Sequence, residues 1–167
     1  LILLGCMNPL ADNYDPSANM DNASCLFNNI SEPFVYVSHP IDGGMYPQDL
    51  NSANTDITFS LEVFNITLGS FGSQGNAFIR YYYNGQQTNK YDSEDFILEL
   101  DTGYHSFEFE LRSTESPFAQ IDPSITSTLN FYIGPSGCTN LNACNYDYLA
   151  DVEDYSCNYP DDYPANE

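Results

Sequence analysis

The sequence predicts an all-β chain, in which a β-sandwich is flanked by two small, loop-rich modules closed by disulfides. Three observations predict this: a central segment alternates apolar and polar residues, both ends carry one cysteine-bracketed motif, and Tyr (14) and Phe (11) are abundant. Strict alternation is typical of strands with one buried face, and aromatic side chains pack well on a pleated surface. The predicted boundaries are a first module at 1–27, the sandwich at 28–136, a second module at 137–160 and an acidic linker to a following domain at 161–167.

The strands of the sandwich are predicted from period-two alternation and from turn residues. The alternating stretches are 57–63, 107–112 and 129–133. Asn84-Gly85 lies between two strand-like runs and predicts a hairpin. Residues 96–111 predict a second antiparallel pair that turns at 101–103. With 33–38, this makes about seven short strands in ~105 residues, the number expected of an immunoglobulin- or fibronectin-III-like sandwich.

The motif at the two ends is GCMNPLADNYDPSANMDNASC, which begins at Gly5, and GCTNLNACNYDYLADVEDYSC, which begins at Gly137. The second copy follows the first at a constant offset of 132 positions, without a gap, and the bracketing cysteines are 19 positions apart in both copies. Internal repeats of this kind fix the architecture before any local pattern does. The chain is therefore organised as module, insert, module.

Equal cysteine spacing in two copies predicts a disulfide inside each module, Cys6 with Cys25 and Cys138 with Cys157. Metal thiolate sites are the competing interpretation, but the close cysteine pairs typical of zinc ribbons are missing. A segment of about 20 residues cannot bury enough surface to fold alone, and closing such a loop contributes roughly 3 kcal/mol. Disulfides predict an oxidising compartment, hence a secreted or cell-surface protein. Cys144 is expected to stay unpaired or to bond to another module.

Both modules are rich in oxygen-bearing side chains at equivalent positions. These candidate metal ligands are Asn8, Asn13, Asp15, Asp21 and Asn22 in the first copy and Asn140, Asn145, Asp147, Glu153 and Asp154 in the second. Ca²⁺ binds six to eight oxygens from carboxylates, amides, carbonyls and water, so a structural calcium ion is one interpretation. The other is that Asn and Asp cap turns through their own side chains.

The two segments resemble the "GCTDPxAxNYDPxAxxDDGSC"-type cysteine repeat of large secreted surface proteins, especially of Bacteroidetes-group bacteria. The usual ending DDGSC is DNASC in the first copy and EDYSC in the second. The central segment is similar to the bacterial immunoglobulin-like modules of such proteins. The resemblance implies a multidomain exported protein with an adhesive or cell-surface role, and it implies no enzymatic activity.

The composition excludes several function classes. A formal charge of −21 with three basic residues leaves no basic surface for nucleic acid, and no stretch has the roughly 20 apolar residues of a membrane span. His39 and His105 have no neighbouring nucleophile motif, so the chain is predicted not to be an enzyme. We therefore expect a non-catalytic structural or adhesive module of a long surface protein or filament. Its expected partners are neighbouring modules of the same chain or identical copies in a fibre.

A carbohydrate-binding accessory module of a secreted enzyme is the alternative. Phe78, Arg80 and Tyr82 share one phase of a predicted strand, and with Lys90 on the hairpin partner they are candidates for stacking a surface glycan. Packing against a neighbouring domain is the competing interpretation of these side chains. The three N-x-S/T triplets, at Asn22, Asn29 and Asn65, are candidate N-glycosylation sites.

Overall fold

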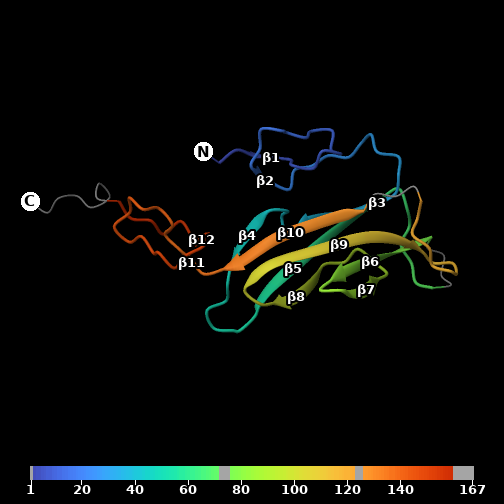
Figure 1. Ribbon diagram of the computed structural model, residues 1–167. Helices are drawn as coiled ribbons and strands as arrows, with labels where there is room; N and C mark the ends of the chain where they lie inside the picture. The colour runs from blue at the N-terminus through green and yellow to red at the C-terminus, as the bar shows by residue number, and fades with distance from the viewer. Residues whose placement is uncertain (1, 72–75, 123–125, 160–167) are drawn as a thin grey trace, which may run out of the picture.

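The computed structural model describes residues 2–71, 76–122 and 126–159. Within these ranges the chain is all-β and has no helix, as the sequence predicts. Two packed sheets form a sandwich, one module lies alongside it and the other continues from the end of β10 (Figure 1). The acidic linker expected at 161–167 lies outside the described residues.

The described strands of the sandwich form a three-stranded and a five-stranded sheet. The first has the order β3 (Phe34–His39), β5 (Thr55–Phe64), β8 (Phe96–Leu100). The second has the order β4 (Gly44–Pro47), β10 (Ser127–Gly134), β9 (Gly103–Ser113), β6 (Ala77–Tyr83), β7 (Gln86–Lys90). Only the β4–β10 pair is parallel among these. The order matches strands A-B-E and A′-G-F-C-C′ of an immunoglobulin-like sandwich.

The predicted alternation sets the buried face of each sheet. Phe59 of β5 is fully buried, and its ring lies 4.9 Å from that of Phe107 on the facing sheet. Phe109 and Phe131 complete the centre of this core. Burial of one Phe side chain contributes roughly 1.5–3 kcal/mol, so this core can hold the sandwich together without a disulfide.

The turn predictions have different outcomes. Asn84 and Gly85 have φ values of 49° and 74°, as a two-residue hairpin turn between β6 and β7 requires. The predicted pairing within 96–111 is wrong, because β8 pairs with β5 and β9 pairs with β6 and β10. The turn at 101–103 reverses the chain direction, but it leads from β8 in the three-stranded sheet to β9 in the five-stranded sheet. Buried His105 hydrogen-bonds to the Asp101 carbonyl at this corner, at 2.9 Å.

Each module contains a parallel ladder of two-residue strands that the sequence pattern did not indicate. The first module pairs β1 (Leu4–Gly5) with β2 (Met20–Asp21), and the second pairs β11 (Ser136–Gly137) with β12 (Val152–Glu153). Two-residue strands are too short to show a period, so only the repeat marks these segments as structured.

Candidate functional site: the two cysteine modules

Both predicted disulfides are present. Cys6 bonds to Cys25 and Cys138 to Cys157, with Cα–Cα distances of 4.9 and 4.8 Å. Cys144 is a free thiol on the surface, at the position that Asp12 occupies in the first module. The two modules therefore have the same covalent frame.

The backbone around each disulfide is also the same. The N–H of Asp15 donates to the Cys6 carbonyl, and the N–H of Asp147 donates to the Cys138 carbonyl, both at 2.9 Å. The repeated glycine lies where these strands cross closely. A Cβ at Gly5 would lie 3.0 Å from Ala18 Cβ, which is tighter than an ordinary van der Waals contact. Gly137 has the same crowded surroundings, and this explains why Gly, Asp and Ala recur together in the motif.

Each of the ten oxygen-bearing side chains accepts a backbone N–H at 2.7–3.1 Å. In eight cases the donor lies two residues further along the chain. In the first module the acceptor–donor pairs are Asn8–Leu10, Asp15–Ser17, Asp21–Ala23, Asn22–Ser24 and Asn13–Leu26. In the second they are Asn140–Asn142, Asp147–Leu149, Glu153–Tyr155, Asp154–Ser156 and Asn145–Asn158. Bonds from a side chain to the backbone two residues on are how Asn and Asp stabilise turns.

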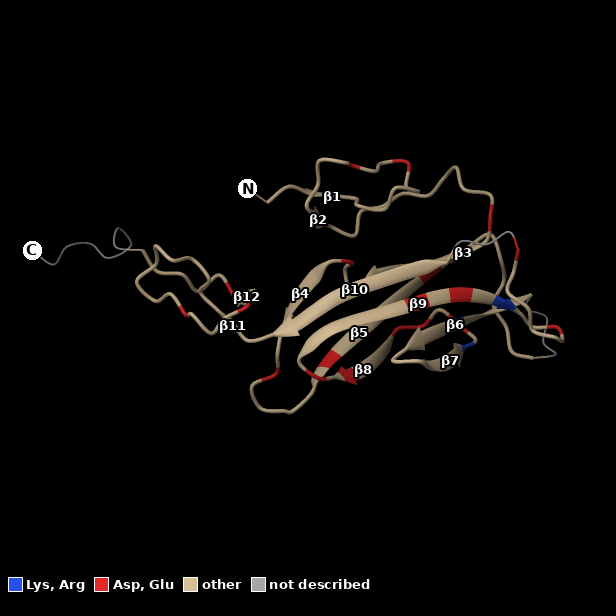
Figure 2. Ribbon diagram, viewed as in Figure 1, with Lys and Arg blue, Asp and Glu red and all other residues tan. Residues whose placement is uncertain are grey.

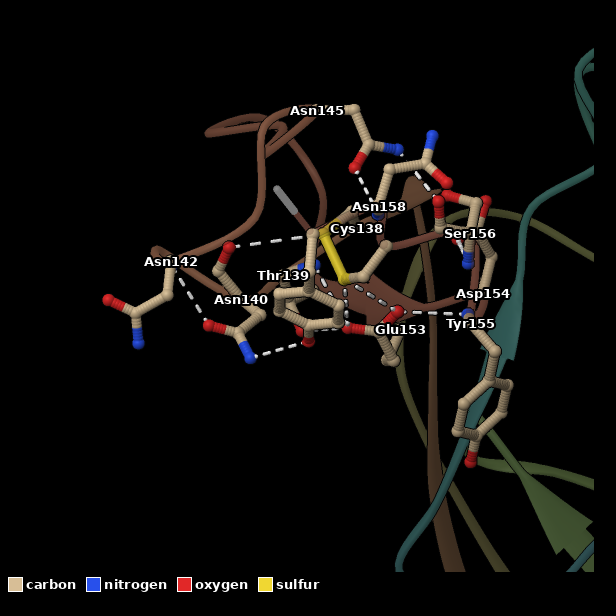
Figure 3. Close-up of a disulfide and its surroundings, with 12 residues drawn as sticks. Cys138, Thr139, Asn140, Asn142, Asn145, Glu153, Asp154, Tyr155, Ser156 and Asn158 are labelled. Atoms are coloured by element: carbon tan, nitrogen blue, oxygen red, sulfur yellow. Dashed lines mark hydrogen bonds between the residues drawn. A yellow bond between two sulfur atoms is a disulfide. The ribbon is translucent and has the colours of Figure 1, made fainter. Parts of the chain in front are cut away.

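The two asparagines of the Asn-Tyr-Asp triplets reach further. Asn13 accepts the Leu26 N–H at 2.8 Å, and its amide donates to the Ser24 carbonyl at 2.7 Å. Asn145 makes the same pair of bonds to Asn158 and Ser156, both at 2.7 Å (Figure 3). Each asparagine thus ties the middle of its module to the segment around the second cysteine, next to the disulfide.

One acidic side chain in each module bridges the ladder to the residue after the first cysteine. Asp21 accepts the N–H of Met7 with one oxygen and the N–H of Ala23 with the other. Glu153 does the same with Thr139 and Tyr155, and it also accepts the Thr139 hydroxyl at 2.6 Å (Figure 3). The hydrogen bonds from the Thr139 hydroxyl and N–H hold the pKa of Glu153 below its ordinary value.

The arrangement favours the turn interpretation over calcium. Among the described residues, three acidic, histidine or cysteine donor atoms come together only at Cys138, Glu153 and Cys157. The two sulfurs of that group are joined in the disulfide, so they are not metal ligands. The side-chain oxygens proposed for calcium are instead spread along the loops, and each residue accepts a hydrogen bond from a different backbone N–H. These hydrogen bonds account for all ten side chains. Calcium binding by the modules stays a prediction.

The first module docks on the sandwich through an aromatic cluster. The ring of Phe27 lies 5.0 Å from Phe34, 4.9 Å from Tyr36 and 5.5 Å from Phe64. Asn65, which follows β5, donates its amide N–H groups to the Ile30 and Glu32 carbonyls, at 2.9 and 3.2 Å. These two carbonyls lie in the linker, residues 28–33, that connects the first module to β3. The connection is therefore packed and hydrogen-bonded.

A cleft of about 280 Å³ lies between the first module and the sandwich, and Asp21, Tyr36 and Asp42 are among the residues that line it. Burial, with smaller contributions from the charges of Asp21 and Glu62, raises the pKa of Tyr36 to about 12. The cleft combines apolar walls with acidic groups, and it belongs to the interface between module and sandwich.

The second module is attached at a different place, the end of the five-stranded sheet. Val152 of β12 is buried, and β12 lies against β4. The Tyr132 hydroxyl of β10 donates to Asp151 at 2.7 Å. The Asp151 and Val152 N–H groups both donate to the carbonyl of Pro135, which directly follows β10, as the Asn19 and Met20 N–H groups donate to the Leu3 carbonyl in the first module.

The predicted glycan-binding face does not form. Phe78 has no exposed surface, because Phe71 packs against its ring at 5.1 Å and Tyr91 at 5.7 Å. Lys90 pairs with buried Ile79 and therefore points to the opposite face of the hairpin from Arg80. The assumption that all four side chains share one exposed surface is therefore wrong.

Arg80 and Tyr82 do lie on the outer face. Arg80 donates to Asn89 at 2.9 Å, and Tyr82 donates to Glu110 at 2.7 Å. Arg112 also bonds to Glu110, at 3.2 Å. These polar groups are satisfied within the sheet. Figure 2 shows acidic residues on both modules and the sandwich, and basic residues only on the sandwich.

The three asparagines of the glycosylation triplets are exposed. Asn22 accepts the Ser24 N–H, and Asn29 donates to Asp12 at 2.7 Å. Asn65 uses its amide nitrogen, the atom a glycan would modify, to hold the linker. Modification at Asn65 would replace one of the two N–H hydrogens that make these bonds.

In comparisons with known proteins, no family model and no curated protein matches the chain. In the part of the chain that the structure describes, no helix has the length and apolar character to span a bilayer.

Proposed function

We propose that this chain is a non-catalytic structural and adhesive segment of a secreted or cell-surface protein, in which disulfide-closed modules connect β-sandwich domains. The observation that carries the proposal is that two copies of one motif build the same disulfide and the same side-chain-to-backbone bonds, and that both are fixed to the sandwich. A loop held by this many bonds fixes the orientation of the domains that it joins, whereas a flexible linker leaves them free to rotate.

Two further features support an extracellular setting. Disulfides persist mainly in oxidising compartments, and small segments without a core depend on them. The net charge of −21 keeps such a chain soluble and opposes self-association. The resemblance of the cysteine motif to repeats of large surface proteins agrees with this setting.

The histidines support a non-catalytic role. His105 is buried and bonded through both ring nitrogens, to the Tyr83 hydroxyl and the Asp101 carbonyl, each at 2.9 Å. His39 packs edge-on against Tyr46, with ring centres 5.5 Å apart. Both residues are thereby explained by packing.

Limited proteolysis with and without a reductant tests the proposal. With the disulfides closed, we expect both modules and the sandwich to resist cleavage. After reduction, cleavage should begin inside 5–25 and 137–157 while the sandwich stays intact. Rapid cleavage of the oxidised modules would contradict a connector role, because a segment that is already flexible cannot fix the orientation of its neighbours.

A further inference from the structure

The two modules bury opposite faces, although their sequences and internal bonds are equivalent. Phe27 of the first module is 8% exposed, whereas its equivalent in the second, Tyr159, is 38% exposed. The reverse holds for Met20, which is 42% exposed, and its equivalent Val152, which is 5% exposed. One fold therefore presents two separate surfaces, and each module has a different one covered.

We name these surfaces by their members. The trailing face consists of Ala11, Asp21 and Phe27 in the first module and of Ala143, Glu153 and Tyr159 in the second. The leading face consists of Leu3, Leu4 and Met20 in the first module and of Pro135, Ser136 and Val152 in the second. All three trailing-face residues are buried in the first module and none is fully buried in the second. All three leading-face residues are exposed in the first module and at least half-buried in the second.

What covers each face is a sandwich. The sandwich that follows the first module covers its trailing face, through the rings of Phe34, Tyr36 and Phe64. The sandwich that precedes the second module covers its leading face, through β4 and the bond from Tyr132 to Asp151. Together the two junctions show both sides of one connector in use.

We propose that each cysteine module docks a sandwich on both faces, and that the trailing face of the second module is the docking surface for a further β-sandwich of the same kind. This inference rests on the connector role proposed above and names its partner. That partner presents aromatic rings on the strands that correspond to β3 and β5, as Phe34, Tyr36 and Phe64 do here. Tyr159 supplies a ring where Phe27 supplies one in the occupied interface.

The leading face of the first module is the complementary half. Leu3, Leu4 and Met20 are 42%, 60% and 42% exposed, and they adjoin because Leu4 pairs with Met20 in the ladder. Adjacent exposed apolar side chains are typical of interaction surfaces. In the second module the equivalent surface lies against β4, so the end of a preceding sandwich fits here.

A tandem chain tests the proposal. It consists of residues 1–159 followed directly by residues 28–159, which keeps the natural offset of 132 positions between modules. Thr88, exposed on β7, is replaced by Cys in both sandwiches for nitroxide labels, and Cys144→Ser removes the free thiol. Pulsed electron spin resonance then measures the distance between the two sandwiches. We expect one narrow distribution, because the second sandwich docks on the module between them.

Two variants of that middle module test docking on the trailing face. Tyr159→Ser also removes the hydrogen bond from the Asn140 amide to the Tyr159 hydroxyl, whereas Ala143→Asp leaves that bond in place. Tyr159→Ser should broaden the distribution, and Ala143→Asp, which places a charge on the same face, should do so as well. Tyr155→Ser is the control, because Tyr155 is 79% exposed and its equivalent Ala23 lies outside the docked surface. A broad distribution in the unsubstituted tandem would overturn the proposal. An unchanged distribution in Tyr159→Ser and Ala143→Asp would also overturn it.

Hydrogen exchange on the same tandem distinguishes the two proposals. If the middle module is protected from exchange but the distance distribution is broad, docking on the trailing face is wrong and the firm module of the proposed function stands. If the module exchanges freely with its disulfide closed, the proposed function itself is wrong.

Discussion

Removing one disulfide at a time should have unequal effects on the sandwich, although the two cross-links are chemically alike. The variants are Cys6→Ser with Cys25→Ser, and Cys138→Ser with Cys157→Ser. Each closed loop spans 19 positions, for which the loop-closure entropy corresponds to about 3 kcal/mol. Either module should therefore lose its fixed structure when its disulfide is removed, because neither has a core that compensates.

Of the two modules, only the first shares a cluster of buried hydrophobic residues with the sandwich, within the residues that the structure describes. Phe27 covers Phe34 and Phe64, and burial of one such ring contributes roughly 1.5–3 kcal/mol. We expect the first double variant to lower the unfolding free energy of the sandwich by about 2 kcal/mol, a shift of roughly 8 °C or more in its melting temperature. The second double variant should leave the main melting transition at the wild-type temperature.

Calorimetry measures the melting of the sandwich, and hydrogen exchange with mass spectrometry measures each module separately. In each variant the amides of the affected module should lose protection while those of the other module keep it. Equal melting shifts in the two variants would refute the reasoning, since it depends on Phe27 being docked. Retained protection in the module without its disulfide would also refute it.

Four further perturbations have defined outcomes. The pKa of Tyr36 is raised to about 12, so the folded state holds this proton more tightly than the unfolded state does, and the contribution to stability is complete below about pH 10 and is lost as the pH rises toward 12. Denaturant titrations across this range should show a steeper loss of unfolding free energy with pH in the wild type than in Tyr36→Phe. Equal slopes of unfolding free energy against pH would contradict the prediction. The lowered pKa of Glu153 works in the opposite direction: its contribution to stability is present above the ordinary pKa of 4.5 and is lost as the pH falls through the lower pKa of the folded state. Glu153→Gln should therefore flatten the acid-induced loss of amide protection in the second module. Asn65→Gly keeps the positive φ of 61° accessible but removes two hydrogen bonds, each worth about 1 kcal/mol. This variant should increase amide hydrogen exchange in residues 28–33, which connect the first module to β3. The control, Asn22→Gly, should leave exchange in 28–33 unchanged. Saturating Ca²⁺ and excess EDTA should give superimposable melting curves, because the side-chain oxygens of both modules are each bonded to backbone N–H groups, and a calcium-dependent rise in melting temperature would restore the calcium interpretation.

Much of the candidate site could be predicted because it is local. The equal cysteine spacing identified both disulfides, since each joins residues within one short repeat. The ten oxygen-bearing residues were also found from the repeat. The sequence does not distinguish a role in turns from a role in calcium binding, because the same residue types serve both purposes. The positions of the neighbouring N–H groups, which the structure provides, favour the turn interpretation.

The glycan face shows where local reasoning fails. Period two correctly placed Phe78 on the outer side of β6, but alternation says only which way a side chain points. Phe71 and Tyr91, from segments before and after the strand, cover its ring. Lys90 was assigned to the wrong face, because its side depends on the register between β6 and β7.

The sequence by itself determined the all-β class, the buried phase of the main strands and the division into two cross-linked modules around a sandwich. These properties depend on periods of two residues and on spacing within one motif, which neighbouring residues encode. The tertiary structure alone decided that β8 and β9 lie in different sheets, and that Phe27 is 8% exposed while Tyr159 is 38% exposed. Such outcomes depend on how whole elements sit against one another, and two copies of the same motif acquire different surroundings because one precedes the sandwich and the other follows it.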